Sequence, residues 1–324
     1  MMRRISDGFL NDLTEETGIL RGLKERVRSD DTLMLALRND SIDIYYRGGR
    51  ILHLARRNGS CSYIAGFDSN YAKPGAPYSI PKVPPTIETS DHCKEWLNAI
   101  PVLKEIMNFY LTEQSAKFER EFQQLVAWEN NRSKLAAPTE YFITDIEYDT
   151  DVKSDDGAVK KARLDMLGLK WLSKDRQNSS SCAPVFIEMK YGTDAFVGKA
   201  GIADHIADLN NILSNERTRS SLNQIIAYQF NQLDRLGLVR FNRAKKHSGV
   251  VLTDKPEVVF LLSNVNPRSS ELSNILKQIQ EPTSYKLRFF VANFAGYGMH
   301  EACMMDLDTF SDWVGRLTNS KGAD

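Results

Sequence analysis

The segment APVFIEMKYG, residues 183–192, decides how the rest of the chain is interpreted. Its apolar residues are typical of a buried strand, and Glu188 and Lys190 interrupt them two positions apart. Because side chains alternate along a strand, both charged groups project from the same face of the sheet. A Glu-x-Lys tripeptide is expected about once in a chain of this length. The strand context therefore matters more than the tripeptide, since charged side chains are seldom fully buried unless they are paired or hold a metal.

Asp165 lies in the same way inside the preceding apolar segment, RLDMLGL, residues 163–169. If the two strands are neighbours, Asp165 and Glu188 converge on one cation. Two carboxylates with the backbone carbonyl of Met189 suit Mg²⁺ or Mn²⁺, and Mg²⁺ keeps several waters and binds phosphate oxygens. Lys190 would then orient or help deprotonate an attacking water and offset the charge that develops. The alternative is a buried ion pair of Asp165 or Glu188 with Lys190 and no metal.

The elements around this segment predict an α/β fold. A helix with an apolar stripe is followed by three strands, two helices and further strands. The strands are expected from Tyr141, Ala162 and Ala183, the helices at 200–213 and 221–236, and the later strands at 257–263, 285–294 and 301–307. The order helix, three strands, helix, strand indicates a mixed central sheet flanked by helices.

The N-terminal part has a different pattern. A helix at 11–28 precedes β-rich segments over 32–67, and turn residues separate these segments at Asn39-Asp40, Gly48-Gly49 and Asn58-Gly59. This pattern predicts an antiparallel β meander. Five prolines between Lys73 and Pro85 disfavour regular structure there. The sequence thus predicts an N-terminal module over 1–90 and a second domain over 91–324.

An Asp in one strand and Glu-x-Lys in the next, after a helix and an acidic first strand, resembles the PD-(D/E)xK nuclease superfamily. The resemblance covers about Ser115 to Ser263. It implies a restriction-endonuclease-like core that hydrolyses phosphodiester bonds of nucleic acid, DNA rather than RNA, with Mg²⁺ or Mn²⁺, in defence or repair. Asp165, Glu188 and Lys190 would be its catalytic residues, although Leu164 stands where the family name has proline.

Two further elements extend the resemblance. Gln224 and Tyr228 form a Q-x-x-x-Y arrangement similar to that of the RecB and lambda-exonuclease branch, and the spacing puts both on one helix face. The resemblance implies supporting or substrate-contact roles for them, and the alternative is an ordinary exposed helix face. The family often has a glutamate on the helix before the strands, for which Glu121 is favoured over Glu119.

Other polar residues near these motifs have open interpretations. Asp145, Glu147 and Asp149 alternate on one face of the first strand, which is expected either of a metal cleft or of a solvated edge strand. His205 lies on the apolar side of the next helix, which is more typical of a satisfied histidine than of a general base. Two basic clusters are candidates for phosphate contact or are solvated faces, namely Lys160, Lys161 and Arg163, and Arg235, Arg240, Arg243, Lys245 and Lys246.

Net charge, cysteine spacing and hydropathy restrict the possible partners and compartment of the protein. Lys plus Arg and Asp plus Glu are 42 each, so the chain as a whole has no basic field that attracts nucleic acid. The four cysteines show no metal-binding spacing, which favours a reduced compartment. The absence of a long apolar segment predicts a cytoplasmic protein without a membrane partner. The zero net charge favours a second hypothesis, a catalytically inactive nuclease-fold module that binds nucleic acid or a protein through the meander.

Overall fold

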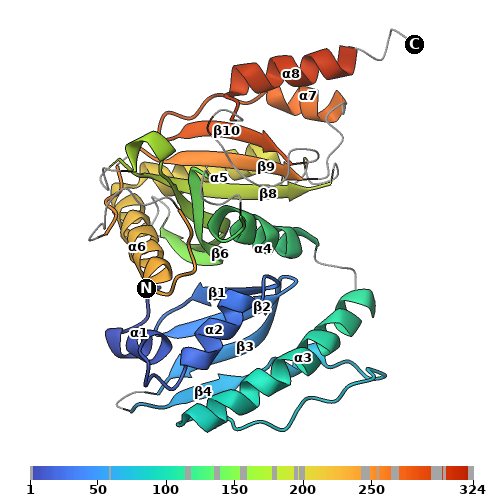
Figure 1. Cartoon of the computed structure of the whole chain (residues 1–324). Helices are drawn as coiled ribbons and strands as arrows, with labels where there is room; N and C mark the ends of the chain where they lie inside the picture. Colours follow the sequence, from blue (N-terminus) through green and yellow to red (C-terminus); the bar gives the residue numbers. More distant parts are fainter. Residues whose placement is uncertain are drawn as a thin grey trace. The chain divides into compact units, whose positions relative to one another are not determined.

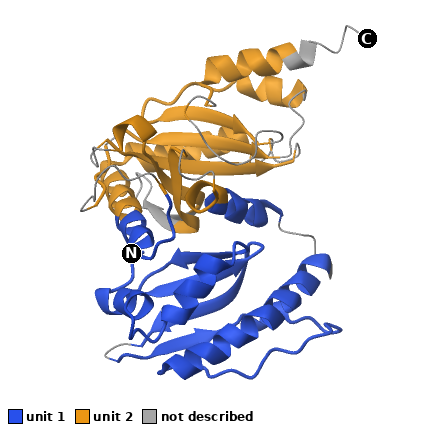
Figure 2. Ribbon diagram, in the orientation of Figure 1, with its two compact units in different colours: residues 1–128, 228–240 blue, residues 129–227, 241–324 orange. Residues whose placement is uncertain are grey.

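The computed structural model of the chain describes most residues and divides them into two compact units (Figure 2). The described residues are 3–57, 60–113, 118–134, 139–153, 159–176, 181–192, 196, 201–241, 249–253, 255–263, 270–292, 301 and 304–319. Unit 1 comprises Met1–Trp128 and Tyr228–Arg240, and unit 2 comprises Glu129–Ala227 and Phe241–Asp324. Two helices, one before and one after the central strands, contribute residues to both units.

Unit 1 contains the antiparallel meander that the sequence predicts. Its five strands pair in chain order, and every pairing is antiparallel. They are β1 (Leu33–Leu37), β2 (Ser41–Tyr46), β3 (Gly49–Arg56), β4 (Tyr63–Gly66) and β5 (Thr86–Ile87), with a short 3₁₀ turn η1 (Ser69–Tyr71) before β5. Alternate apolar residues of β1 to β4 are buried, so one face of this sheet forms part of the core.

The β2–β3 turn lies one residue earlier than expected. Tyr46 pairs with Gly49, so Arg47 and Gly48 are the two turn residues. Both have positive φ angles, 49° and 74°, as a two-residue type I′ hairpin requires. The predicted turn at Asn58-Gly59 lies outside the described residues.

The single helix predicted over 11–28 is wrong, because the chain forms two helices there. They are α1 (Asp7–Thr14) and α2 (Arg21–Ser29). Between them Gly18 approaches α1 so closely that a Cβ atom at this position would lie 2.3 Å from the Asp12 carbonyl oxygen. The chain thus turns back onto the end of α1 at Gly18, where its N–H donates to the Glu15 carbonyl oxygen, and the sequence pattern did not reveal this turn.

The long helix α3 (Ser90–Glu113) belongs to unit 1. It contacts α2, β3 and β5, and its buried side chains are Cys93, Trp96, Ala99, Ile100, Leu103, Ile106, Met107 and Leu111. The compact unit therefore extends to Trp128, whereas the sequence places a domain boundary near residue 90. The prolines mark a segment without regular structure between β4 and β5, and contacts of α3 with the meander continue the same core beyond it.

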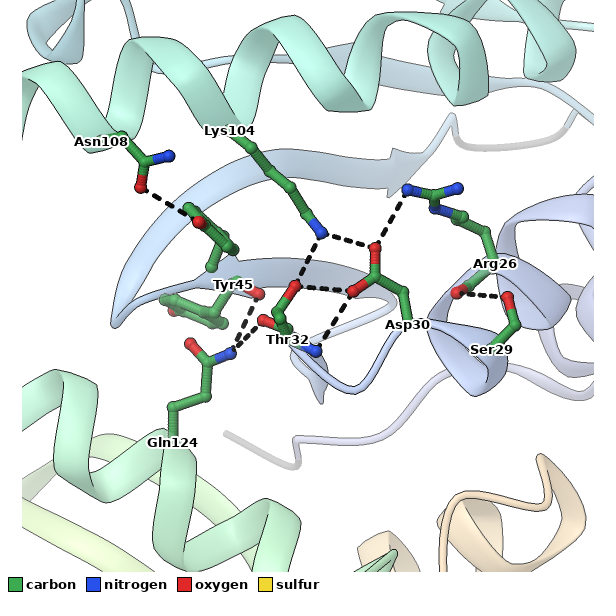
Figure 3. A network of polar contacts seen from close by, with 9 residues as sticks. Arg26, Ser29, Asp30, Thr32, Tyr45, Lys104, Asn108 and Gln124 are labelled. Carbon is green, nitrogen blue, oxygen red and sulfur yellow. Dashed lines mark hydrogen bonds and ion pairs between the residues drawn. The ribbon is translucent and has the colours of Figure 1, made fainter.

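A polar network joins four elements of unit 1 (Figure 3). The Lys104 ammonium on α3 donates to Asp30 Oδ2 at 2.5 Å and to Thr32 Oγ1 at 2.6 Å. Gln124, on α4 (Phe118–Asn131), donates to the Thr32 carbonyl oxygen at 2.7 Å and accepts from Gly48 N–H at 2.9 Å. This network ties the N-terminal half of α4 to the meander.

Unit 2 is built on a mixed sheet of five strands (Figure 1). The strands are β6 (Tyr141–Lys153), β7 (Val159–Lys170), β8 (Ala183–Tyr191), β9 (Glu257–Ser263) and β10 (Lys286–Val291). They lie in chain order across the sheet, with β6, β7 and β8 antiparallel and β8, β9 and β10 parallel. The predicted α/β class with a mixed sheet is thus confirmed.

Four described helices belong wholly or mainly to unit 2. The helices are α5 (Ile202–Ser214), α6 (Glu216–Arg235), α7 (Ser270–Leu276) and α8 (Leu307–Asn319), with a 3₁₀ turn η2 (Ser173–Asp175) after β7. In Figure 1, α5 lies behind the sheet, and α8 lies beside β10. The strand predicted at 301–307 is wrong for the part of it that the structure describes, residues 301 and 304–307, where Met305 forms an isolated bridge with Phe289 and α8 begins at Leu307.

Candidate active site

The candidate site lies where strands β7 and β8 separate. Their ladder runs as far as the pair Met166–Ile187. Beyond this pair, β8 continues along β9 and β7 continues along β6. Continuing the β7–β8 register by one residue places Asp165 opposite Glu188. Residues directly opposite on antiparallel strands project from the same face, with Cβ atoms about 4.5–5.5 Å apart.

Asp165 occupies the fork between the two strands. Its Oδ2 accepts a hydrogen bond from the Met189 N–H at 2.8 Å, and the residue is 8% exposed. The carboxylate thus satisfies an amide that no longer has a partner strand on this side. In a strand the N–H and C=O of one residue point to the same side. The Met189 carbonyl is therefore also directed toward the fork.

Glu188 carries two contacts on one carboxylate oxygen. Lys190 Nζ lies 2.8 Å from Glu188 Oε1, and His205 Nδ1 lies 2.5 Å from the same atom. Glu188 and Lys190 are 4% and 5% exposed, which agrees with the buried strand that the sequence predicts. Among the residues that the structure describes, none forms a hydrogen bond or ion pair with Glu188 Oε2.

The electrostatics of Glu188 favour the charged form. Burial acts to raise the pKa of this carboxyl, but the hydrogen bond from His205 and the charge of Lys190 outweigh burial and hold the pKa below its ordinary value. Two carboxylates facing each other across a strand pair repel one another. Cationic groups at this position, whether Lys190 or a metal ion, relieve that repulsion.

The donor set fits a hard cation with few protein ligands. Within the described residues, no three His, Cys, Asp or Glu side chains are grouped so as to hold a metal ion by themselves. Two carboxylates and one carbonyl remain, which is the kind of set that Mg²⁺ uses when waters and substrate phosphate complete its octahedron. Asp165, Glu188 through Oε2 and the Met189 carbonyl are the groups that would hold it.

The acidic residues of β6 run beside this fork. Asp145 pairs with Leu167 and Asp149 with Arg163, the residues on either side of Asp165 along one face of β7. Glu147 lies between them with a φ of 52°, in the left-handed region that is uncommon for a side chain other than glycine.

These β6 acids differ in their surroundings. Asp145 is fully buried, and its Oδ1 accepts from the Ile146 N–H at 2.9 Å. Arg163 donates to Asp149 Oδ1 at 2.9 Å and to Glu147 Oε2 at 3.2 Å. Asp149 is exposed, as the solvated-edge interpretation expects, whereas Asp145 is not.

The residues predicted from the RecB-like motif lie on an exposed helix face. Gln224 and Tyr228 are both exposed on α6. Arg4 lies over the Tyr228 ring, 5.3 Å from its centroid, and both belong to unit 1, whereas Gln224 belongs to unit 2. Neither residue has a contact with Glu188 or Lys190 among those found between described residues. Their supporting roles remain predictions.

Glu121 has a specific partner in unit 1. Arg47 Nε donates to Glu121 Oε1 at 2.8 Å, and the terminal guanidinium nitrogen donates to Oε2 at 3.2 Å. This bidentate ion pair connects α4 with the β2–β3 turn. A role for Glu121 next to the unit 2 carboxylates remains a prediction.

The two basic clusters are described only in part. Arg163 is paired with acids, and Arg235 lies 3.7 Å from Asp7 Oδ1. Arg240 is exposed. The remaining members lie outside the described residues or have side chains that are not described, namely Lys160, Lys161, Arg243, Lys245 and Lys246. Neither cluster is therefore established as a phosphate-contacting surface.

The contact of His205 was not foreseen in the sequence. The helical pattern predicts a satisfied, partly buried histidine, but it does not identify the partner. The structure provides Glu188 as that partner, so α5 packs on the face of the sheet from which Glu188 projects. The nearest sequence signal is that His205 follows the Glu-x-Lys strand at the start of the next helix.

Comparison of the chain with protein-family models, with curated proteins and with solved structures gave no significant match. Among the described helices, none has the length and apolar character needed to cross a membrane. The class of protein therefore has to be argued from the site.

Proposed function

We propose that this chain is a Mg²⁺- or Mn²⁺-dependent nuclease that hydrolyses phosphodiester bonds, in DNA rather than RNA. The observation that carries the proposal is the fork between β7 and β8. There the carboxylate of Asp165 accepts from the N–H of Met189, the neighbour of Glu188, at 2.8 Å, and Lys190 Nζ lies 2.8 Å from Glu188 Oε1. Outside the fork, the order of α4, strands β6 to β8, helices α5 and α6 and strand β9 agrees with the restriction-endonuclease-like core that the resemblance implies.

In this proposal, Asp165 and Glu188 bind the metal ion, and Lys190 acts on the water and the phosphate. A divalent ion held at this site supplies a Lewis acid for a phosphate oxygen and lowers the pKa of bound water. Asp165 and Glu188 bind the cation and set its position. Lys190 is a buried ammonium with three donors, of which one contacts Glu188. In the proposal the others orient the attacking water and stabilise charge on the phosphorane.

A second candidate is a catalytically inactive module on the same fold, which binds nucleic acid or a protein. The Glu188–Lys190 contact favours it, because a buried ion pair satisfies both groups without a metal. The two candidates differ in turnover. They do not differ in the geometry of the site.

Cleavage of labelled DNA and RNA with Mg²⁺, Mn²⁺ or EDTA tests the proposal. We expect Glu188→Gln, Asp165→Asn and Lys190→Ala to lower kcat by about 100-fold or more, because each removes a group that acts on the transition state. Asp149→Asn is the matched control, since Asp149 is an exposed carboxylate on the same sheet. Its activity should equal that of the wild type.

Thermal melts of each variant separate loss of the site from loss of the fold. Equal cleavage by the wild type and the site variants, or cleavage that persists in EDTA, would falsify the proposal. Binding of DNA without turnover under every divalent ion favours the inactive module.

A further inference from the structure

We propose that His205 is a positioning residue that holds Glu188 by one oxygen, so that the other oxygen stays directed at the cation. This inference rests on the proposed function and deepens it. His205 Nδ1 lies 2.5 Å from Glu188 Oε1, while no described residue forms a hydrogen bond or ion pair with Oε2. A carboxylate held at one oxygen has a defined orientation for the second.

The helix that carries His205 is well anchored. Ile202, Ile206 and Leu209 are buried along α5, and the His205 N–H donates to the Gly201 carbonyl oxygen at 3.1 Å in the first turn of the helix. Buried apolar residues at this spacing fix the helix against its neighbours. The imidazole thus reaches Glu188 from a rigid backbone, as a positioning group must.

His205 and Lys190 both contact Glu188 Oε1, but their side chains differ in rigidity and in the number of donors. Lysine is a flexible chain with rotatable donors, whereas imidazole is a rigid ring with two nitrogens on opposite sides. Because His205 supplies a fixed contact to Oε1, Lys190 keeps donors for water and phosphate. His205 therefore serves the site through Glu188 rather than through the reacting atoms.

The exposure of His205 separates this role from ordinary core packing. Its side chain is 27% exposed, whereas the Glu188 side chain that it contacts is 5% exposed. A histidine needed only to fill the core has no reason to pair with a carboxylate of the candidate site. Outer contacts that orient a metal-binding side chain typically change metal affinity by 10–100-fold.

Three substitutions test the role. In His205→Asn the amide nitrogen stands at the position of Nδ1, so the donor to Glu188 is retained. His205→Leu removes the donor at similar volume, and His205→Gln displaces it by one carbon. His92→Leu, on α3 in unit 1, is the matched control because it removes a histidine remote in sequence from the site.

The first measurement is calorimetric titration of the full chain with Mn²⁺ in the absence of nucleic acid. We expect His205→Leu and His205→Gln to weaken Mn²⁺ binding by about 10–100-fold, and His205→Asn to bind within about threefold of the wild type. DNA cleavage should follow the same order in kcat, with KM for DNA little changed. Melting curves confirm that each variant is folded.

The outcomes distinguish a failure of the His205 positioning role from a failure of the nuclease proposal. If the wild type binds Mn²⁺ and His205→Leu binds it equally well, or if Asn restores nothing, the positioning role is overturned and the nuclease proposal stands. If the wild type binds no Mn²⁺ and cleaves no nucleic acid, both proposals are overturned.

Discussion

Asp43 on β2 is a buried carboxylate held by several donors of unit 1. It is 4% exposed, and its oxygens lie 2.7 Å from His53 Nδ1, 3.2 Å from Arg38 Nε and 3.3 Å from the Tyr45 hydroxyl. Burial acts to raise the pKa of Asp43, but the hydrogen bond from His53 and the charge of Arg38 outweigh it and hold the pKa below its ordinary value. Its charge is therefore part of what stabilises the meander.

Asp43→Asn tests this contribution. We expect a loss of about 2–3 kcal/mol in the free energy of unfolding at neutral pH. This loss is smaller than for a fully buried ion pair, because His53 and Arg50, whose terminal nitrogen lies 3.7 Å from Asp43 Oδ1, are both partly exposed. Since the pKa of Asp43 is lowered in the folded state, its stabilisation is complete above the ordinary carboxyl pKa of about 3.9. It is lost as the pH falls through the depressed value.

Urea unfolding of the wild type and Asp43→Asn at pH 7 and at successively lower pH measures this. The difference between the two proteins should shrink below about pH 4. Asp91→Asn is the control, since the exposed Asp91–Lys94 pair also lowers a pKa but lies in solvent. A difference that stays constant into acid would contradict the assignment.

At the scale of elements, the β2–β3 turn is where the meander meets α4. Gly48 has a φ of 74°, and its N–H donates to Gln124 Oε1 at 2.9 Å. A Cβ atom at this position would lie 2.6 Å from the backbone carbonyl carbon of Arg120. Two requirements, a left-handed turn and a close approach, thus fall on one glycine.

Gly48→Ala should destabilise unit 1 by at least about 2 kcal/mol, since the left-handed conformation alone costs about 1–2 kcal/mol for a residue with a side chain. Gly66→Ala on β4 is the matched control, because no described residue has an atom within 4 Å of a Cβ atom there. Chemical unfolding of both variants measures the difference. Equal stability of the two would show that α4 moves away from the turn at little cost.

At the scale of the whole molecule, the contacts between residues divide the chain elsewhere than at the proline-rich segment near residue 90. The proline-rich segment precedes α3, yet α3 buries Trp96, Ile100 and Met107 within unit 1. The last segment of unit 1, Tyr228–Arg240, comes from far along the chain. Gln232 in this segment exchanges hydrogen bonds with the backbone of Ile5, at 2.6 and 3.1 Å.

A fragment of residues 91–324 should therefore not fold like the intact protein. It retains α3 without the sheet on which the apolar side of α3 packs, and exposed apolar patches of that kind cause association. We expect the fragment to bind a hydrophobic dye and to elute as aggregates in size-exclusion chromatography. The full chain in the same buffer is the control. A monomeric fragment with a cooperative melt would contradict this expectation.

Some of the candidate site was predictable from local sequence, because it depends on local periodicity. Glu188 and Lys190 had to share a face once residues 183–191 formed a strand. The strand at 257–263 was predicted with the bounds that the structure has, since its apolar run is short and uninterrupted. The C-terminal helix α8 was missed, although its buried residues Leu307, Phe310 and Val314 recur at helical spacing.

The sequence by itself determined the class of fold, the antiparallel meander and the residues on each face of the central strands. Only the tertiary structure decided that Asp165 bonds the Met189 N–H beside Glu188, that the β7–β8 ladder ends at Met166–Ile187, and that His205 reaches Glu188 from α5. The physical reason is that side-chain direction follows from a repeat of two residues. Register and helix packing depend on burial between segments far apart in the chain.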